Sequence, residues 1–327
     1  MAKNKQVYNR FYTKEKWEKV NSYNKELYED FLIELKSAGT PETTYKQYKN
    51  DARIILILIM EMFDNKKIFE MKKKDFRKLV MHFTDLGMSP RRVNRLKSCC
   101  STMMTFGENS EDYEDIEDNY VAKVKSVKLK DVREIVFLDD DEVETIYNYL
   151  MDEKKYQEAL LISIAYDSAA RCSEVQQLMR DDIIDGVPMT KREVNGKGGK
   201  TFRLSINRRT LETYKIYEAN REDDLPYLWV NDLGNRATSF NLYSWVKTWI
   251  EILKEERGVE KDFNFHSFRH SCLENLEVGS HYIARAMGRK FTIQELQLLA
   301  HHSSSDVTMS YLKNKDDDKL METFKLV

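Results

Sequence analysis

Residues 39–63 constrain the fold most strongly, because they combine a helix start with the longest apolar run of the chain. The start is typical of a helix N-terminus, with Thr40 as the capping residue, Pro41 at the first helical position and Glu42 in the first turn. The apolar run that follows, residues 54–60, is far shorter than the roughly 20 residues that a membrane-spanning helix needs. The segment therefore predicts a long helix of a globular domain rather than a membrane span.

A second helix start lies at Ser89 and Pro90, and the helix predicted after it has two different faces. Its apolar stripe is formed by side chains at three- and four-residue spacing, namely Val93, Leu96, Cys100 and Met103 or Met104. Its other face carries basic and amide side chains, namely Arg91, Arg92, Asn94, Arg95 and Lys97. Such a face suits contact with DNA, but an ordinary solvated helix has the same character, so both interpretations stay open for this segment alone.

Charge is distributed unevenly along the chain. Residues 1–107 contain 22 Lys and Arg against 13 Asp and Glu, whereas the remaining residues contain 31 basic against 42 acidic side chains. The formal net charge of the whole chain is −2. A basic N-terminal part favours an anionic partner, although a solvated helical surface accounts for part of the excess.

An acidic run over residues 107–120 interrupts the apolar periodicity, and lysines at positions 123, 125, 128 and 130 follow it. This change in composition predicts an N-terminal domain over residues 1–120, a linker over residues 121–135 and a second domain over residues 136–327. The alternating lysines suit either a segment that follows the phosphate backbone of a nucleic acid or an exposed β-strand.

Composition is typical of a mainly helical globular protein with a small β-sheet. The chain has 327 residues, enough for two domains, with only 11 Gly and 4 Pro. The β-like region is residues 187–206, where glycines at positions 196, 198 and 199 connect two short strands. The N-terminus has no hydrophobic signal core and the four cysteines form no C-x-x-C motif, so we expect a cytoplasmic protein without a disulfide framework or a zinc ribbon.

Four short segments of the second half contain side chains that suit chemistry on an anion. They hold Arg171, Lys197, His266 with Arg269, and His302 with Tyr311. Each group also has a plain structural explanation. A helical arginine pairs readily with a glutamate three residues later, a lysine at a hairpin tip is often just solvated, and most tyrosines belong to a core.

His266 and His270 stand four residues apart, a spacing that also occurs in metal sites. A metalloprotease helix of the H-E-x-x-H type has Glu after the first His, but Ser267 stands there. Arg269 also places a permanent cation beside the pair, which disfavours a divalent metal. We therefore expect no metal at this pair, and His270 is predicted to support the site rather than to bind a ligand.

Taken together, these segments resemble the catalytic motif of the tyrosine recombinases, the phage integrase family. That motif is an Arg with a Glu three residues later, a Lys on a β-hairpin, His-x-x-Arg, a further His or Trp, and a Tyr nine residues after it. The corresponding residues are Arg171, Lys197, His266, Arg269, His302 and Tyr311. Residues 40–56 and 87–106 resemble the first and last helices of the family's N-terminal core-binding domain, so the resemblance covers roughly residues 25–315.

The resemblance implies a helical core-binding domain followed by an α+β catalytic domain that breaks and rejoins DNA strands at specific sites. Tyr311 would attack a phosphodiester and form a 3'-phosphotyrosyl bond, with Lys197 as general acid for the leaving 5' oxygen. Arg171 and Arg269 would clamp the non-bridging oxygens. The two histidines of the motif would donate hydrogen bonds to the phosphate, and the first of them would also accept the proton of the tyrosine.

The resemblance also implies a partner and a place of action. The partner is double-stranded DNA, bound by a homo-oligomer (a dimer or tetramer) in the cytoplasm of a bacterial host, at its nucleoid, as suits an integrase of a prophage or other mobile element. Because arginines and a lysine supply the positive charge, no metal or other cofactor is implied. The residues expected to contact DNA are Thr43, Thr44, Lys46, Arg91, Arg92, Asn94, Arg95, Lys97, Lys123 and Lys125.

Three features depart from the family's usual sequence. Ala169 replaces the Gly of a T-G-L-R segment, where a helical alanine should be tolerated, and His301 replaces the Gly of L-G-H. An offset of one residue would make His301 rather than His302 the histidine of the site. The segment between Arg269 and His302 is also longer than usual. These features leave an alternative open, a catalytically silent DNA-binding regulator such as a phage repressor that keeps the recombinase fold.

Overall fold

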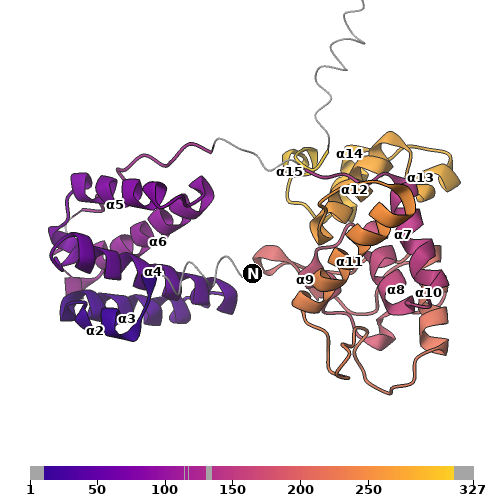
Figure 1. The fold of residues 1–327 in the computed structure, drawn as a ribbon, viewed down its shortest axis with the longest axis horizontal. Helices are drawn as coiled ribbons and strands as arrows, with labels where there is room; N and C mark the ends of the chain where they lie inside the picture. The colour runs from indigo at the N-terminus through magenta and orange to yellow at the C-terminus, as the bar shows by residue number, and fades with distance from the viewer. Residues whose placement is uncertain (1–10, 114, 117, 130–134, 313–327) are drawn as a thin grey trace, which may run out of the picture. The chain divides into compact units, whose positions relative to one another are not determined.

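The computed structural model describes residues 11–113, 115–116, 118–129 and 135–312. The chain divides into two compact units, residues 1–133 and 134–327, and the division falls within the segment for which the sequence predicts a linker (Figure 1). In the described ranges both units are mainly helical and the second contains a two-stranded sheet, so the predicted mainly α fold with a small β-sheet is confirmed. None of the helices described is long and apolar enough to cross a membrane.

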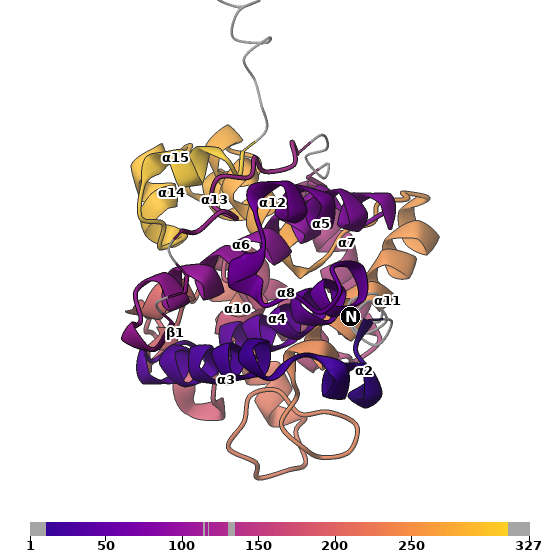
Figure 2. The ribbon, with the colours of Figure 1, turned by 90° about the vertical axis from the view of Figure 1, so that its left-hand side faces the viewer.

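The first unit is a helical bundle arranged around α4 (Figure 2). Its elements are α2 (Lys14–Lys19), α3 (Ser22–Ser37), α4 (Glu42–Met62), the 3-10 turn η1 (Ile68–Glu70), α5 (Lys73–Asp85), α6 (Pro90–Glu108) and the 3-10 turn η2 (Glu111–Tyr113). Helix α4 contacts α2, α3 and α6, and residues 54–59 of α4 are all buried. A helix that is apolar all round lies inside a bundle, which explains the apolar run in the sequence.

The two predicted helix starts have different outcomes. Helix α6 begins at Pro90, and the Ser89 hydroxyl accepts a hydrogen bond from the Arg92 N–H at 3.3 Å, so this cap is confirmed. Helix α4 begins one residue later than predicted, with Pro41 at the cap position, so the predicted Thr40 cap is wrong. The reason is that Thr40 still belongs to the end of α3, because its N–H donates to the Leu35 carbonyl at 3.0 Å.

A buried carboxylate joins α4 to α6. The side chain of Asp51 is 3% exposed, and it accepts hydrogen bonds from Nη1 of Arg92 at 2.6 Å and from Nε of Arg95 at 3.0 Å. Burial lowers the pKa of Arg92, while attraction to the Asp51 carboxylate opposes that shift. Two of the arginines that were expected to contact DNA therefore also hold the bundle together.

The segment after α6 packs back onto that helix. The side-chain amide of Asn94 donates to the Val127 carbonyl at 2.9 Å, and its oxygen accepts from the Val127 N–H at 2.8 Å. Val121 and Val124 are buried in the core of the first unit. Residues 121–127, which the sequence assigns to the linker, thus pack as part of the first unit.

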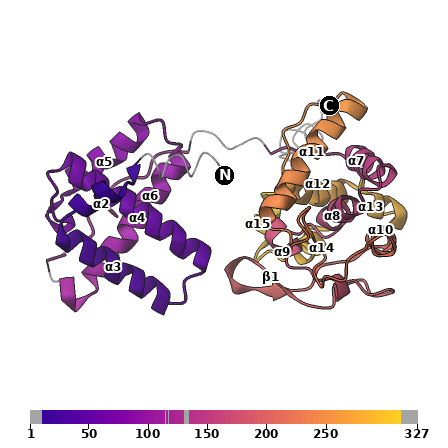
Figure 3. The ribbon, with the colours of Figure 1, turned by 60° about the horizontal axis from the view of Figure 1, so that its bottom comes forward.

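The second unit is arranged around α8, whose residues 159–167 are all buried. Its elements are α7 (Asp140–Asp152), α8 (Tyr156–Asp167), α9 (Cys172–Val175), the 3-10 turn η3 (Arg180–Asp182), β1 (Val194–Asn195), the 3-10 turn η4 (Lys197–Gly199), β2 (Thr201–Phe202), α10 (Arg208–Ala219), α11 (Ser239–Arg257), α12 (Phe265–Val278), α13 (Tyr282–Met287), α14 (Ile293–Leu299) and α15 (Ser305–Met309). Helix α8 contacts α7, α9, α10 and α12. The antiparallel strands β1 and β2 form a hairpin next to α9 (Figure 3).

Residues 277–294, where the sequence leads us to expect the extra length, include α13, which is packed against the second unit. The Tyr282 hydroxyl on α13 donates to the buried Asp167 carboxylate at 2.6 Å. Arg285 forms an ion pair with the buried Asp140 at 2.7 Å. Both contacts join α13 to residues of the core around α8, so α13 is anchored in that core by two buried carboxylates.

We expect Asp51→Asn to destabilise the first unit by about 3 kcal/mol, because it leaves the buried Arg92 guanidinium without its counter-charge. Urea unfolding of the full chain, with hydrogen exchange in α4 and α6 as the local readout, measures this change. As a control, Lys46→Ala removes an exposed ion pair with Glu42 and should change the stability by less than about 0.5 kcal/mol. Equal effects of the two substitutions would contradict the role given to Asp51.

Candidate functional site

Side chains from separate parts of the second unit gather around Tyr311. Arg171 occupies the cap position of α9, His266 and Arg269 lie on the first turns of α12, and His302 lies between α14 and α15. Tyr311 itself follows α15 and is partly buried against the core of the second unit. Five of the six motif residues are therefore brought together by the packing of α9, α12 and the α14–α15 connection.

Arg269 lies at the centre of this cluster and is 1% exposed. Its Nη1 donates to the Ala169 carbonyl at 2.5 Å, and its Nη2 donates to the Ala300 carbonyl and to Nε2 of His302, both at 2.6 Å. Because a guanidinium has no acceptor, Nε2 of His302 has to accept and Nδ1 carries the proton, which it donates to the Thr308 hydroxyl at 3.0 Å. Arg269 thus fixes both the position and the tautomer of His302.

The two residues that replace family glycines, Ala169 and His301, both adopt the left-handed backbone conformation, with φ of 51° and 52°. The expectation that Ala169 is helical is wrong, because α8 ends at Asp167 and Ala169 lies beyond it. A residue with a Cβ costs about 1 kcal/mol in this conformation. The turn at Ala169 points its carbonyl at Arg269, and the turn at His301 follows the second carbonyl that Arg269 binds.

The ring of Tyr311 is surrounded by the cluster. Its centroid lies 5.2 Å from the guanidinium carbon of Arg269, 4.8 Å from the His302 ring and 5.3 Å from the His266 ring. His270 stacks on it at 4.4 Å, and Nδ1 of His270 is 3.0 Å from the Tyr311 carbonyl oxygen. His270 therefore supports the site by holding Tyr311. The signal for it in the sequence is a histidine directly after the His-x-x-Arg motif.

Arg171 is held by the carboxylate of Glu174, which is 1% exposed on the side chain. The carboxylate accepts from the Arg171 N–H at 2.7 Å and from its Nη1 at 2.8 Å. Burial lowers the pKa of Arg171, but the Glu174 carboxylate and the Tyr311 hydroxyl outweigh burial and raise it. The i,i+3 pair that the sequence offers as a structural explanation therefore exists, and it also orients Arg171 toward Tyr311.

The histidines of the cluster are poor bases in this environment. Burial lowers the pKa of His302 to about 3, with repulsion from Arg269 and Arg171 as further causes. Burial also lowers the pKa of His266 to about 4, together with His270 and the same two arginines. Both imidazoles are therefore neutral near pH 7, while both guanidiniums remain charged. The site combines two cations with neutral donors and acceptors, which suits a bound oxyanion.

Lys197 lies apart from the cluster. It begins the 3-10 turn at the tip of the β1–β2 hairpin and is exposed. In the described part of the chain no hydrogen bond or ion pair links Lys197 to the other motif residues. The histidine next to the site contacts the hairpin instead, since the His301 ring stacks on Phe202 of β2 with centroids 3.8 Å apart. Of the two adjacent histidines, His302 is thus the one beside Tyr311.

The residues expected to contact DNA fall into two groups. One group has intramolecular partners: Arg92 and Arg95 with Asp51, Asn94 with Val127, Lys97 with Ser126, Lys46 with Glu42, and Lys123 with Asp118. The other group is exposed and, within the described ranges, forms no ion pair: Thr43, Thr44, Arg91 and Lys125. The exposed group is the one free to meet a phosphate backbone without first breaking a contact.

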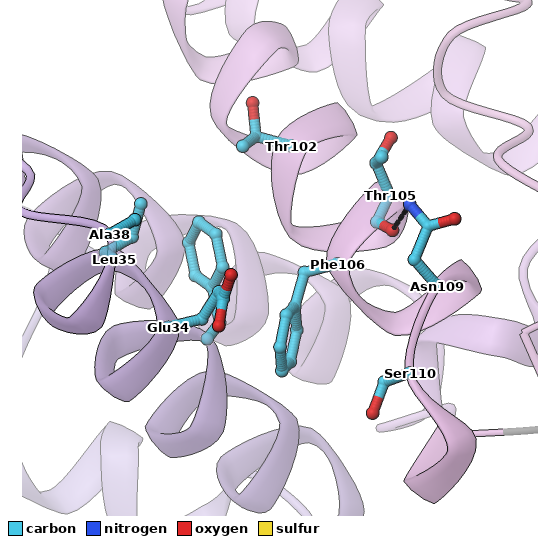
Figure 4. A pocket seen from close by; sticks show the side chains of 9 residues that line it. Glu34, Leu35, Ala38, Thr102, Thr105, Phe106, Asn109 and Ser110 are labelled. Carbon is cyan, nitrogen blue, oxygen red and sulfur yellow. Dashed lines mark hydrogen bonds between the residues drawn. The ribbon is translucent and has the colours of Figure 1, made fainter.

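Two further features of the described residues lie outside the cluster. In the first unit, a groove of about 510 Å³ between α3 and α6 is lined by Phe31, Glu34, Leu35, Ala38, Thr102, Thr105, Phe106, Asn109 and Ser110 (Figure 4). In the second unit, Asp140, Asp141 and Glu144 lie close enough to share a cation, but Asp140 already binds Tyr166 and Arg285. Neither feature includes a residue of the recombinase motif.

Comparison with known proteins agrees with this arrangement. The model of the phage integrase family matches residues 136–318. The SPbeta prophage-derived recombinase-like protein YomM of Bacillus subtilis is 23% identical over 319 residues, covering 93% of this chain and 91% of that protein. A tyrosine recombinase of Thermosipho africanus is 24% identical over 303 residues, covering 92% and 98%.

Solved structures show the same fold. The integrase of the transposon Tn1549 in complex with circular intermediate DNA superposes with a TM-score of 0.65 at 16% identity, covering 91% of this chain and 99% of that one. Lambda integrase, as a dimer bound to a core site, gives a TM-score of 0.63 at 15% identity, with 86% and 96% covered. Since the family model spans more than half of the chain, the chain belongs to the phage integrase family, the tyrosine recombinases.

Proposed function

We propose that this protein is a site-specific DNA recombinase that binds duplex DNA and breaks and rejoins its strands through a 3'-phosphotyrosyl intermediate. The observation that carries the proposal is the Tyr311 ring enclosed by Arg269, His266 and His302, with Arg171 oriented toward its hydroxyl. A tyrosine used only for packing has no need of two guanidiniums beside it. A tyrosine that attacks a phosphate needs them, because they stabilise the charge on the phosphorus centre.

In the proposed reaction the Tyr311 oxygen forms a bond to phosphorus, and the bond from phosphorus to the 5' oxygen breaks with its electron pair going to that oxygen. Lys197 supplies the proton that the 5' oxygen takes up. His266 takes the tyrosine proton, and a phosphate bound in the site would make it a better base by offsetting the repulsion from the arginines that lowers its pKa. A 5' hydroxyl of another strand reverses these steps, so the bond energy is kept in the covalent intermediate and no cofactor is consumed.

The proposed partner is double-stranded DNA, bound by this chain as a homo-oligomer. Lambda integrase is seen as a dimer on a core site and as a tetramer on a Holliday junction, which supports the same for this chain. The relation to a prophage-derived protein supports a role in a phage or other mobile element. The place of action would be the nucleoid in the cytoplasm of a bacterial host.

We expect wild-type protein to form a covalent adduct with a duplex that is recovered by binding-site selection and nicked so that the short 5' product diffuses away. Tyr311→Phe should form no adduct and still bind the duplex, because phenylalanine keeps the ring that stacks on His270. A denaturing gel of labelled DNA measures the adduct, and EDTA should not change its yield, since arginines supply the positive charge. Binding by the wild type without any adduct would favour the silent DNA-binding regulator.

We expect Arg91→Gln to weaken DNA binding uniformly across sequences and to lower the slope of log affinity against log salt by about 1. The reason is that Arg91 is exposed and removing it breaks no ion pair within the described part of the chain. Arg92→Gln is the matched variant one position along, and it should also destabilise the first unit because it removes a partner of Asp51. Titrations at several salt concentrations test this, and an unchanged salt slope for Arg91→Gln would contradict it.

We expect the stability of the second unit to fall on acidification from pH 7 to pH 5 by at least about 2 kcal/mol. His266 and His302 have pKa values near 4 and 3 when folded, lowered by burial, against about 6.5 when unfolded. The unfolded state therefore binds protons first, so stability is lost as the pH falls through 6.5 toward the folded pKa. Urea unfolding at each pH, and the imidazole titrations by NMR, measure this. Folded pKa values near 6.5 would contradict the neutral state assigned to both histidines.

A further inference from the structure

The base of the hairpin that carries Lys197 is built around the ring of Phe202. Phe202 on β2 pairs with Val194 on β1, and its ring lies directly against Gly196. A Cβ placed on Gly196 would be 2.4 Å from Cε1 of Phe202, so only a glycine leaves room for this ring. The residue next to Lys197 is therefore in van der Waals contact with Phe202.

The same ring is also stacked against His301. The two rings are nearly parallel, with centroids 3.8 Å apart and an angle of 19° between their planes. His301 stands directly before His302 and adopts a left-handed conformation in which glycine would be the least strained residue. His301 thus contacts the same Phe202 ring that lies against the backbone of Gly196.

On the opposite side, the hairpin is attached to the end of α9. Gln177 accepts from the Asn195 N–H at 2.8 Å and donates to the Asn195 carbonyl at 2.9 Å. The tip beyond this base contains Gly198 and Gly199, with φ of 77° and 76°. The base of the hairpin is therefore contacted both by Gln177 and by His301.

We propose that His301 and Phe202 are positioning residues for Lys197. They hold the base of the hairpin against the loop that contains His302, and so set where the general acid Lys197 meets the leaving 5' oxygen. The stack is the contact by which the loop before His302 reaches the hairpin, and it ends one residue from Lys197. This inference rests on the proposed function, because it explains the position of Lys197 as the general acid of that reaction.

His301→Gly is the sharpest substitution, because glycine accepts the φ of 52° and the fold is kept while the ring is removed. Without DNA, hydrogen exchange of residues 194–202 should become faster in this variant than in wild type, with α12 unchanged. His301→Phe keeps an aromatic ring on Phe202 and should restore slow exchange. Exchange in the hairpin that does not differ between wild type and His301→Gly would overturn the proposal.

The catalytic consequence is measured with two versions of the nicked duplex used for the adduct assay. One has the normal 5' oxygen at the scissile phosphate, and the other has sulfur in that bridging position. The sulfur version breaks its bond from phosphorus to sulfur with the electron pair leaving as a thiolate, which needs no proton from Lys197. A residue that acts by positioning the general acid therefore matters for the oxygen duplex and not for the sulfur duplex.

We expect His301→Gly and Phe202→Leu to form adduct about tenfold or more slowly on the oxygen duplex and within about twofold of wild type on the sulfur duplex. In a Lys197→Ala background, His301→Gly should cause no further loss on the oxygen duplex, because the group that it positions is gone. Leu298→Ala is the control, since this exposed side chain lines the same hollow as His301 without entering the stack.

The remaining outcomes separate this proposal from the function on which it rests. Equal losses on both duplexes would show that His301 acts through His302 and the phosphate, and would overturn the proposal. The proposal would also be overturned if His301→Gly cut the oxygen duplex at the wild-type rate. If the wild type forms no adduct with either duplex on a bound site, the recombinase function itself fails, and the exchange data alone then decide whether the stack holds the hairpin.

Discussion

The buried guanidinium of Arg269 is the contact on which the site depends. It joins α12 to the turn after α8 and to residues 300–302, segments that are distant in sequence. Its hydrogen-bond partners are backbone carbonyls and a neutral imidazole rather than a carboxylate, so its charge is stabilised by dipoles alone at hydrogen-bond distance. A cation held in this way has no carboxylate at hydrogen-bond distance among the described residues, whereas the charge of Arg171 is partly balanced by Glu174.

Local signals in the sequence were sufficient to predict the helices and the order of the candidate site residues along the chain. The Ser89 cap and the stripe of α6 follow from side-chain periodicity, which depends only on near neighbours in the chain. The Thr40 cap was wrong because a backbone bond to Leu35 decides where α3 ends. The two helix starts show that spacing predicts the existence of a helix better than its first residue.

Long-range partners could not be predicted in the same way. The basic face of α6 is visible in the sequence, but only the structure shows that Asp51, far away in the chain, takes Arg92 and Arg95 while Arg91 stays exposed. The left-handed turn at Ala169 was missed because an alanine gives no signal for it. His270 was recognised as a supporting residue, yet its contact with the Tyr311 carbonyl needed the fold.

The neutral state of the two histidines beside Tyr311 has a consequence for the encounter with DNA. Burial lowers their pKa values most, and repulsion from the guanidiniums of Arg269 and Arg171 lowers them further. A phosphodiester placed there would offset it and favour the protonated imidazoles, so the histidines would gain protons as the backbone enters. Binding of DNA is then coupled to uptake of protons, so the affinity of the protein for its DNA site depends on pH.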